Sequence, residues 1–224
     1  RLMLNILLSF AQFEREVTGE RIRDKIAASK RKGMWMGGYP ALGYDVKDRQ
    51  LVINEAEAVT IRRIFQRFVE LRSATDLCRE LALDGITTKA WKTADGGVRN
   101  GTPIDKKYLA KALRNPIYVG EIRHKGVVHV GQHEPIITRQ LWDRVQAILA
   151  EDAHGRMGAT QTRGKTDALL RGLLYGSNGE KYHITFSTKR SGKKYRYYMP
   201  KADSRYGYRT SATGLIPAGQ IEEV

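Results

Sequence analysis

Positively charged side chains are the residues of this sequence whose number and spacing point most directly to a chemistry. Lysines and arginines number 39 against 24 aspartates and glutamates, so the formal net charge at pH 7 is +15 and the isoelectric point is about 10.0. Cationic side chains release the counterions held by nucleic-acid phosphates, so this balance favours a polyanionic partner, and we expect nucleic acid. The alternatives are a basic enzyme for small acidic molecules and a surface charged for solubility.

Nucleophiles and metal ligands are few and scattered. Cys78 is the only cysteine, which excludes a disulfide framework, and its place in the apolar pattern of an expected helix indicates a buried structural thiol. His124, His129 and His133 have no acidic or sulfur ligand at a fixed spacing, so surface or core histidines are the simpler interpretation. Ser9 lies among bulky apolar residues, and no Ser–His–Asp or paired-carboxylate arrangement emerges. We therefore expect no catalytic residue, no metal site and no cofactor in this chain.

One stretch places cations on a helix that two strands follow. A helix is expected over 102–115, with Thr102 as its cap and Pro103 at its first position. Two strands are expected next, over 117–125 and 127–131. A capped helix with outward cations followed by strands is typical of a winged helix-turn-helix that contacts DNA, although a solvated helix face would look the same. The candidate DNA contacts are Lys106, Lys107, Lys111, Arg114, Arg123 and Lys125.

A second stretch, "TKRSGKKYRYY" at 188–198, alternates cations with aromatic residues on a predicted strand pair. Cations there can bind phosphates, whereas the simpler alternative is a basic edge that resists aggregation. The candidate DNA contacts of this region are Lys189, Arg190, Lys193, Lys194, Arg196, Arg205 and Arg209.

The element that opens the chain is expected to be one long helix, running to about Lys32 and ended by Gly33. It is apolar on all sides from Leu2 to Phe13, as in a helix that is buried all round, and more polar afterwards. Because no capping residue precedes the apolar run, the chain looks cut from a larger protein. The second half carries Arg15, Arg21, Arg23, Lys30, Arg31 and Lys32. Taken alone, its alternating glutamates and arginines indicate ion pairs along the helix surface.

The elements that must position these groups follow from hydrophobic spacing. A hairpin is expected over 42–53, then a helix that Asn54 caps with Glu57 as its capping-box partner. A further helix is expected from Ser73 to about Asp84, and another from Thr138 to about Ala150. The side chains expected to face the core are Ala58, Ile61, Ile64, Phe65, Phe68, Leu77, Leu81, Leu83, Ile104, Tyr108, Leu109, Ala112, Leu141, Val145 and Leu149.

The composition divides the chain. Residues 152–167 are polar, rich in glycine and threonine and poor in large apolar groups, which marks a linker. The apolar opening is too short for a membrane span and lacks a cleavage site, so we expect no membrane partner and no secretion. The absence of disulfides fits a reducing cytoplasm.

The order of segments resembles that of the large serine recombinases, also called serine integrases. "LLSFAQFEREVTGERIRDKIAASKRKG" is similar to the end of their catalytic domain and the long helix leaving it, here 1–33. "GGYPALGYD", "LVINEAEAVTIRRIF" and "LCRELALDGITT…LAKALRNPIYVGEIRHKG" are similar to their recombinase domain, here 34–151. "LLRGLLYGSNGEKY…KYRYYMP" is similar to their terminal zinc ribbon, here 168–224.

The resemblance implies an α+β fold with a long N-terminal helix, a mixed, winged-helix-like recombinase domain and a small β-ribbon domain. It implies a function in DNA integration, excision or inversion. Members cleave both strands at two attachment or crossover sites through a serine, rotate half of a tetramer and rejoin the ends. It places the protein in the cytoplasm of a bacterium, near the nucleoid, encoded by a mobile element or phage. The serine of the family lies upstream of the long helix, so we expect this chain alone not to cleave DNA.

The ribbon segment departs from the family pattern. Members hold this domain with two pairs of zinc-binding cysteines, but "YGSNGEKY" and "YYMPKADSRYG" contain none. We expect a zinc-free ribbon that is held by apolar packing of Leu173, Tyr182, Phe186, Tyr195 and Tyr197.

Two other functions stay open on the sequence. A non-catalytic DNA-binding regulator derived from a recombinase would share the same segments. An RNA-binding basic protein is the third possibility, but no stacking-aromatic signature or glycine-rich clamp supports it.

The missing cysteines predict a metal-independent fold. Elemental analysis of the purified chain should find no stoichiometric zinc, and a chelator should leave the midpoint of thermal unfolding unchanged, because no thiolate pair exists to bind the metal. One zinc ion per chain that survives dialysis would contradict the prediction.

Overall fold

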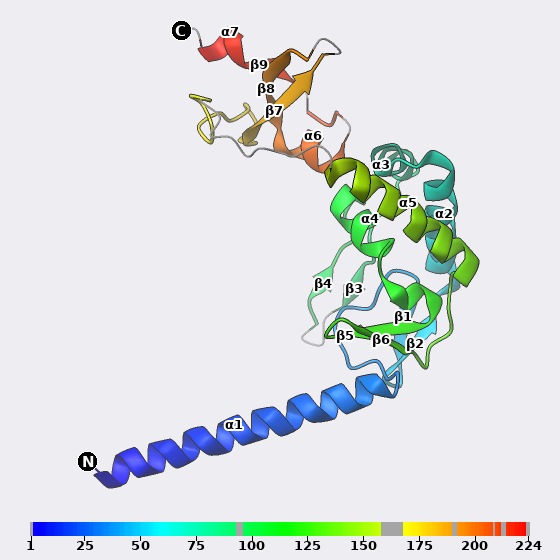
Figure 1. Ribbon diagram of the computed structural model, residues 1–224, viewed down its shortest axis with the longest axis vertical. Coiled ribbons are helices and arrows are strands. Elements are labelled where there is room, and N and C mark those ends of the chain that lie inside the picture. The colour runs from blue at the N-terminus through cyan, green and yellow to red at the C-terminus, as the bar shows by residue number, and fades with distance from the viewer. Residues whose placement is uncertain are drawn as a thin grey trace. The chain divides into compact units, whose positions relative to one another are not determined.

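Figure 1 shows the computed structural model, which describes residues 2–92, 96–157, 168–189, 192–207, 209–211 and 214–222. The chain forms two compact units. The first comprises the chain up to Phe65 together with Asn115–Asp143, and the second comprises Gln66–Arg114 together with Arg144–Val224. Helices and small antiparallel sheets make up both units, which confirms the predicted α+β class. The predicted domain boundaries remain a prediction.

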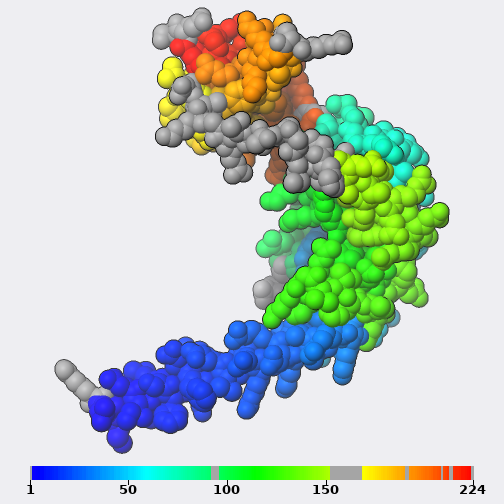
Figure 2. Space-filling model, viewed as in Figure 1, coloured from blue at the N-terminus to red at the C-terminus, as the bar shows by residue number. Residues whose placement is uncertain are grey.

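The N-terminal helix α1 (Leu2–Arg31) is the longest element of the first unit (Figures 1 and 2), and its extent confirms the sequence prediction. Its burial differs from what the apolar opening suggested, because none of its described side chains is buried. Leu2 is 78% exposed and Phe13 62% exposed. The apolar all-round pattern therefore marks a helix surface that has no partner among the described residues of this chain.

Gly33 ends α1 and joins it to the segment around Gln132. Its backbone is left-handed (φ 74°), and its N–H donates to the carbonyl of Lys30 at 3.0 Å. The Gly33 carbonyl accepts from the N–H of Gln132 at 2.9 Å, and the Gln132 side-chain amide donates to the carbonyl of Lys32 at 3.0 Å. A Cβ on Gly33 would lie 2.1 Å from the carbonyl oxygen of Val130. The close approach therefore requires glycine.

The core of the first unit forms around Tyr44. Strands β1 (Tyr44–Lys47) and β2 (Gln50–Ile53) pair antiparallel through a turn in which Asp48 and Arg49 both have positive φ. Tyr44 is fully buried, and its hydroxyl donates to the carbonyls of Glu134 at 2.7 Å and Ile117 at 3.1 Å. These bonds tie the hairpin to a distant part of the chain.

The segment after residue 115 differs from the predicted strand. Asn115 accepts a hydrogen bond from the N–H of Ile117 and opens the 3-10 helix η1 (Pro116–Val119), which ends at the left-handed Gly120. The strand β5 therefore begins only at Glu121 and pairs antiparallel with β6. The bounds are β5 Glu121–His124 and β6 Val127–Val130.

Helix α2 (Glu55–Leu71) begins as predicted but with a different capping bond. The N–H of Glu57 donates to the Asn54 side chain at 3.3 Å, whereas the Glu57 carboxylate accepts from the N–H of Gly43 rather than from Asn54. The bond between Gly43 and Glu57 links the segment before the β1–β2 hairpin to α2. The predicted apolar face is confirmed, because its members Ala58, Ile61, Ile64, Phe65 and Phe68 are all buried.

The helical part of the second unit contains α3 (Ala74–Leu83) and α4 (Lys106–Ala112), which pack against each other. Ser73 caps α3 as predicted, but Leu83 is 83% exposed and not in the core. The cap of α4 is Asp105 rather than Thr102, because the Asp105 carboxylate accepts from the N–H of Tyr108 at 2.7 Å. Two short strands, β3 (Trp91–Lys92) and β4 (Val98–Arg99), lie between these helices in the chain.

Helix α5 (Arg139–Met157) is longer than predicted. Thr138 caps it, and Val145 is fully buried, as expected. Leu141 and Leu149 are only partly buried, and Trp142 and Ile148 take the core positions instead. The helix continues into the first six residues of the predicted linker, and 158–167 lie outside the described residues.

The C-terminal part of the second unit is a ribbon with the strand order β7-β8-β9. Its elements are β7 Tyr182–Thr188, β8 Lys194–Pro200, α6 Lys201–Tyr206, β9 Ile216–Pro217 and α7 Ala218–Glu222. Its buried core comprises Tyr182, Tyr198 and Ala218. The predicted core was wrong in part, because Leu173 is 71% exposed and Phe186 is 46% exposed. Tyr195 and Tyr197 are half-buried.

A carboxylate organises the loop of the ribbon where relatives were expected to place a cysteine pair. Asp203 accepts hydrogen bonds from the backbone and hydroxyl groups of Thr210 and Ser211, at 2.7 to 3.0 Å. Burial alone would raise the pKa of Asp203, but these bonds outweigh it and leave the pKa below its ordinary value. The loop is therefore closed by hydrogen bonds to a charged group.

Among the described helices, none combines the length and apolarity that crossing a bilayer requires.

The close approach of Gly33 to Val130 can be tested with a matched pair of glycine substitutions. Gly33→Ala and Gly37→Ala both place an alanine at a positive φ, but the Gly37 Cβ would meet no atom within 4 Å. Gly37→Ala should lower the free energy of unfolding by about 1 kcal/mol, and Gly33→Ala should lower it by more, because Val130 blocks its Cβ. Urea unfolding followed by circular dichroism measures the difference, and equal effects would contradict the proposed close approach.

Candidate nucleic-acid interface

The first group of candidate DNA contacts lies along α1 and at its C-terminal end. Arg15, Arg21 and Arg23 lie in the solvent-exposed middle of the helix, and Lys30 lies near its end. The Arg23 guanidinium donates to the carbonyl of Gly19 at 3.0 Å, which holds it along the helix surface. Arg31 and Lys32 are exposed beyond them.

The end of α1 brings its cations to those of the β5–β6 hairpin. Helix α1 contacts both strands, and the two Gln132 bonds fix the helix end beside them. Burial lowers the pKa of the His124 imidazole, and the positive charges of Lys30 and Lys125 lower it further. Arg123 and Lys125 are exposed on the hairpin. The cations at the end of α1 and on the hairpin beside it are together called the α1 seat, and they are Lys30, Arg31, Lys32, Arg123 and Lys125.

The second group lies on α4. Lys107 and Lys111 are exposed, and Leu109 and Ala112 hold the opposite side of the helix in the core. Lys106 and Arg114 line a cleft of about 770 Å³ between α3, α4 and α5. Arg72, which the sequence prediction did not include, lines the same cleft and forms an ion pair with Glu151 at 3.5 Å.

The third group lies on the hairpin of β7 and β8. The ammonium groups of Lys189 and Lys193 lie 5.0 Å and 5.4 Å from the ring centre of Tyr195, within the range of cation–π attraction. Lys194 is exposed, whereas Arg196 lies 3.3 Å from the Glu222 carboxylate, and Arg190 lies outside the described residues. The hairpin holds two cations over one aromatic ring.

Arg205 and Arg209, two further candidate contacts, also have partners within the protein. The Arg205 guanidinium donates to the Asp105 carboxylate at 2.7 Å, and that of Arg209 donates to the carbonyl of Ser211 at 3.3 Å. Arg205 therefore links the ribbon to the start of α4, and Arg209 stabilises the loop of the ribbon. Their contact with DNA remains a prediction.

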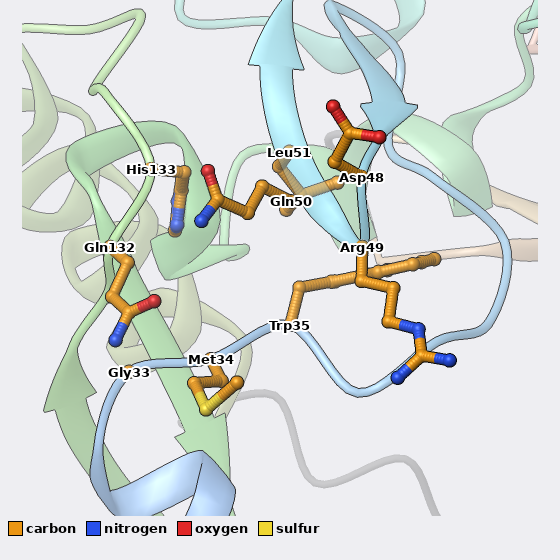
Figure 3. A pocket seen from close by; sticks show the side chains of 9 residues that line it. All are labelled: Gly33, Met34, Trp35, Asp48, Arg49, Gln50, Leu51, Gln132 and His133. Atoms are coloured by element: carbon orange, nitrogen blue, oxygen red, sulfur yellow. The ribbon is translucent and has the colours of Figure 1, made fainter.

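A small cavity near the end of α1 contains no catalytic arrangement (Figure 3). It measures about 140 Å³, and among its lining residues the Gln50 side chain extends toward the His133 ring. His133 Nε2 lies 2.7 Å from the carbonyl oxygen of Ile117. Burial lowers the pKa of His133, so the ring is neutral and donates this bond. His133 is a core histidine, as the simpler interpretation of the sequence had it.

Cys78 is fully buried, as its pattern indicated. Burial raises the pKa of its thiol to about 11, and the negative charge of Asp105 adds to this effect. A thiol in such surroundings is protonated at neutral pH and therefore a poor nucleophile. Within the part of the chain that the structure describes, no group of three or more His, Cys, Asp or Glu residues is placed to hold a metal ion.

Comparison with known proteins gives one family match. Residues 55–152 match the family model named Recombinase. We call this stretch the Recombinase domain after the model that it matches. This stretch covers most of α2 to α5 and contains the α4 lysines and the β5–β6 hairpin, and the match confirms the predicted relationship to recombinases. No curated protein matches the chain.

Two solved structures are similar to the chain over 91% of its length. One, described as "Sequence Requirements of the Listeria innocua prophage attP site", has 29% identity, a TM-score of 0.47 and 83% of its own length covered. The other, described as "Crystal Structure of a LSR-DNA Complex", has 28% identity and a TM-score of 0.48. This chain spans 61% of the length of that second protein.

The burial of Cys78 in this Recombinase domain predicts slow thiol chemistry. In native buffer at pH 8 the thiol should react with a disulfide reagent far more slowly than free cysteine, and in denaturant it should react at the free rate, because thiolate is scarce below a pKa of about 11. Absorbance of the released reagent measures both rates. Fast reaction of the native protein would show that the thiol is accessible and activated.

Proposed function

We propose that this chain is the DNA-binding part of a site-specific serine recombinase, an enzyme that integrates, excises or inverts DNA by cleaving both strands, rotating subunits and rejoining. The observation that carries the proposal is the placement of exposed cations on a Recombinase domain and on the ribbon. The α1 seat, helix α4 and the β7–β8 hairpin each carry exposed cations.

The two modes of DNA contact differ among these surfaces. Lysines on α4 and on the β5–β6 hairpin are point charges suited to phosphates, which position a protein on the duplex without reading its sequence. Arginines along α1 and in the cleft beside α4 can also donate two hydrogen bonds to guanine in the major groove. We assign the lysines to affinity and the arginines to base recognition.

The apolar half of α1 supports the proposed assembly. Leu4, Leu8 and Phe13 are each about 60% exposed or more, which is unusual for large side chains in contiguous turns. In the full-length recombinase we assign this surface to packing on the catalytic part and on the equivalent helix of a second subunit. This gives a homodimer on each DNA site and a tetramer when two sites pair. We place this reaction in the cytoplasm of a bacterium, on DNA of a mobile element or phage.

DNA binding is tested by fluorescence anisotropy with a mixed-sequence 40-base-pair duplex at several salt concentrations. The affinity should fall steeply with salt, because each neutralised phosphate releases counterions. The double variant Lys107→Gln/Lys111→Gln should lower the slope of log K against log salt by about 2, or about 1 for each lysine. The control Lys47→Gln/Arg79→Gln removes the same charge from exposed residues outside the proposed interface and should change the slope less.

The same titration with single-stranded and duplex RNA of equal length separates the other possibilities. Preference for duplex DNA supports the proposal, whereas stronger binding to RNA would support the RNA-binding alternative. A slope that is equally reduced by both double variants would show that only the net charge matters, and the α4 surface would then lose its assignment.

A further inference from the structure

Helix α7 places a carboxylate against a cation of the β7–β8 hairpin. Glu222 is the last residue of α7, and its Oε2 lies 3.3 Å from a terminal nitrogen of Arg196 on β8. The other oxygen, Oε1, accepts a hydrogen bond from the Tyr198 hydroxyl at 2.6 Å. The Glu222 side chain is only 7% exposed, whereas that of Arg196 is 39% exposed. The Arg196 guanidinium therefore binds a buried anion while it stays partly open to solvent.

The ribbon core holds α7, and with it Glu222, in place. The helix contacts both β8 and β9. Ala218 is buried in the same cluster as Tyr198, and Ile221 packs against that cluster. A helix of only five residues has little stability of its own, so its position depends on these apolar contacts and on the bonds of Glu222.

A cleft of about 390 Å³ lies between β8 and α7. Strand β9 pairs with β8 only at Tyr197 and Tyr198, and among the described residues no strand continues this pairing beside 194–196. Because an unpaired strand edge presents N–H groups, backbone donors as well as cations are available here. Such a combination suits an oxyanion. The lining residues are Lys194, Tyr195, Arg196, Tyr197, Pro217, Gly219 and Gln220.

The partner of Arg196 resembles the ligand that the hairpin is proposed to bind. A carboxylate and a phosphate both present two negatively charged oxygens that a guanidinium can bind side by side. Glu222 is therefore an internal group with the binding chemistry of a DNA phosphate. Lys194, the other cation of the cleft, is exposed.

We propose that the cleft between β8 and α7 is a phosphate-binding site of the ribbon, with Lys194 and Arg196 as its cations, and that Glu222 is an internal competitor for Arg196. When a DNA phosphate enters the cleft, Arg196 turns from Glu222 to the phosphate. DNA binding and the docking of α7 then oppose each other, and the opposition is reciprocal. The identity of the ligand as DNA rests on the proposed function, whereas the ion pair between Arg196 and Glu222 does not.

The burial of Glu222 determines the size of the effect. Once Arg196 has left, the carboxylate retains the Tyr198 bond but not the neighbouring positive charge that neutralises it. An uncompensated charge in a buried position is unfavourable, so the exchange lowers the net affinity for DNA. Glutamine at position 222 would carry no charge and would still accept the Tyr198 bond. The variant Glu222→Gln should therefore bind DNA more tightly than the parent protein.

The ion pair is tested first without DNA, by ¹⁵N relaxation of the Arg196 side-chain Nε–H group in the full chain. We expect restricted motion in the parent protein and faster motion of larger amplitude in Glu222→Gln, because the charged partner is gone. Arg171, an exposed arginine elsewhere in the ribbon, should behave alike in both proteins. Circular dichroism confirms that the variant is folded. Equal mobility of Arg196 in the two folded proteins would overturn the internal competitor.

Competition is tested by fluorescence anisotropy with the 40-base-pair duplex. Glu222→Gln should raise the affinity about 3-fold, as expected for a half-exposed ion pair, and Arg196→Gln should abolish that gain in the double variant. The control Glu134→Gln removes a carboxylate from an exposed residue of the first unit and should raise the affinity less. An equal gain from Glu222→Gln with and without Arg196 would show an effect of net charge alone and would overturn the competition.

The cleft itself is tested through Lys194, which takes no part in the ion pair with Glu222. Lys194→Gln should lower the slope of log K against log salt by about 1, and Arg171→Gln should lower it less. Equal changes would remove the assignment of the cleft as a phosphate site. Absence of duplex binding by the parent protein would overturn the proposed function, and the relaxation measurement would still decide on the ion pair.

Discussion

The carboxylate of Asp105 is the interaction on which the arrangement of the second unit depends. One oxygen caps α4 and the other binds Arg205, so a single side chain both starts the lysine-bearing helix and meets the ribbon. A helix of only seven residues has little intrinsic stability, and a charged cap near its positive N-terminal end supplies part of what it lacks. The elements that present the cations of α4 are therefore held in place by one of the few buried anions of the chain.

The cations of the chain divide into two groups with different physical roles. Those with carboxylate partners, such as Arg67 with Glu80 and Arg139 with Glu121, join one helix or strand to another. Lys107 and Lys111 are exposed on a helix whose other side is buried, and Lys189 and Lys193 lie over the Tyr195 ring at the exposed end of the β7–β8 hairpin. With a net charge of +15, a polyanion can neutralise this second group without disturbing the first.

Features that depend on local spacing could be predicted from the sequence. The apolar face of α2, the Ser73 cap and the hairpin turn at Asp48–Arg49 each follow from residues within a few positions of one another. The misassigned α4 cap is instructive, because Thr102, Pro103 and Asp105 are all acceptable near a helix start and only packing selects Asp105. Leu83 satisfied the periodicity but is the last residue of α3 and is 83% exposed.

Features that join distant residues could not be predicted. Arg205 is predicted to contact DNA because cations near an aromatic-rich strand look alike in a sequence, and no local signal indicated its ion-pair partner Asp105, 100 residues earlier. The same holds for Tyr44, whose hydroxyl binds carbonyls more than 70 residues further along the chain. The first half of α1 is a further case. Its apolar pattern suggested burial on all sides, whereas none of the described side chains of α1 is buried in this chain.

The loops of the ribbon are held by several hydrogen bonds and by packing among its described residues. The Tyr198 ring fills the core, and its hydroxyl accepts from the N–H of Leu170 and donates to Glu222 at 2.6 Å. Asp203 closes the other loop through charge-assisted hydrogen bonds, which are stronger than neutral ones. Because α6 begins within this network and ends at Gly207, close to Thr75 and Lys106, these groups also determine where the ribbon meets α3 and α4.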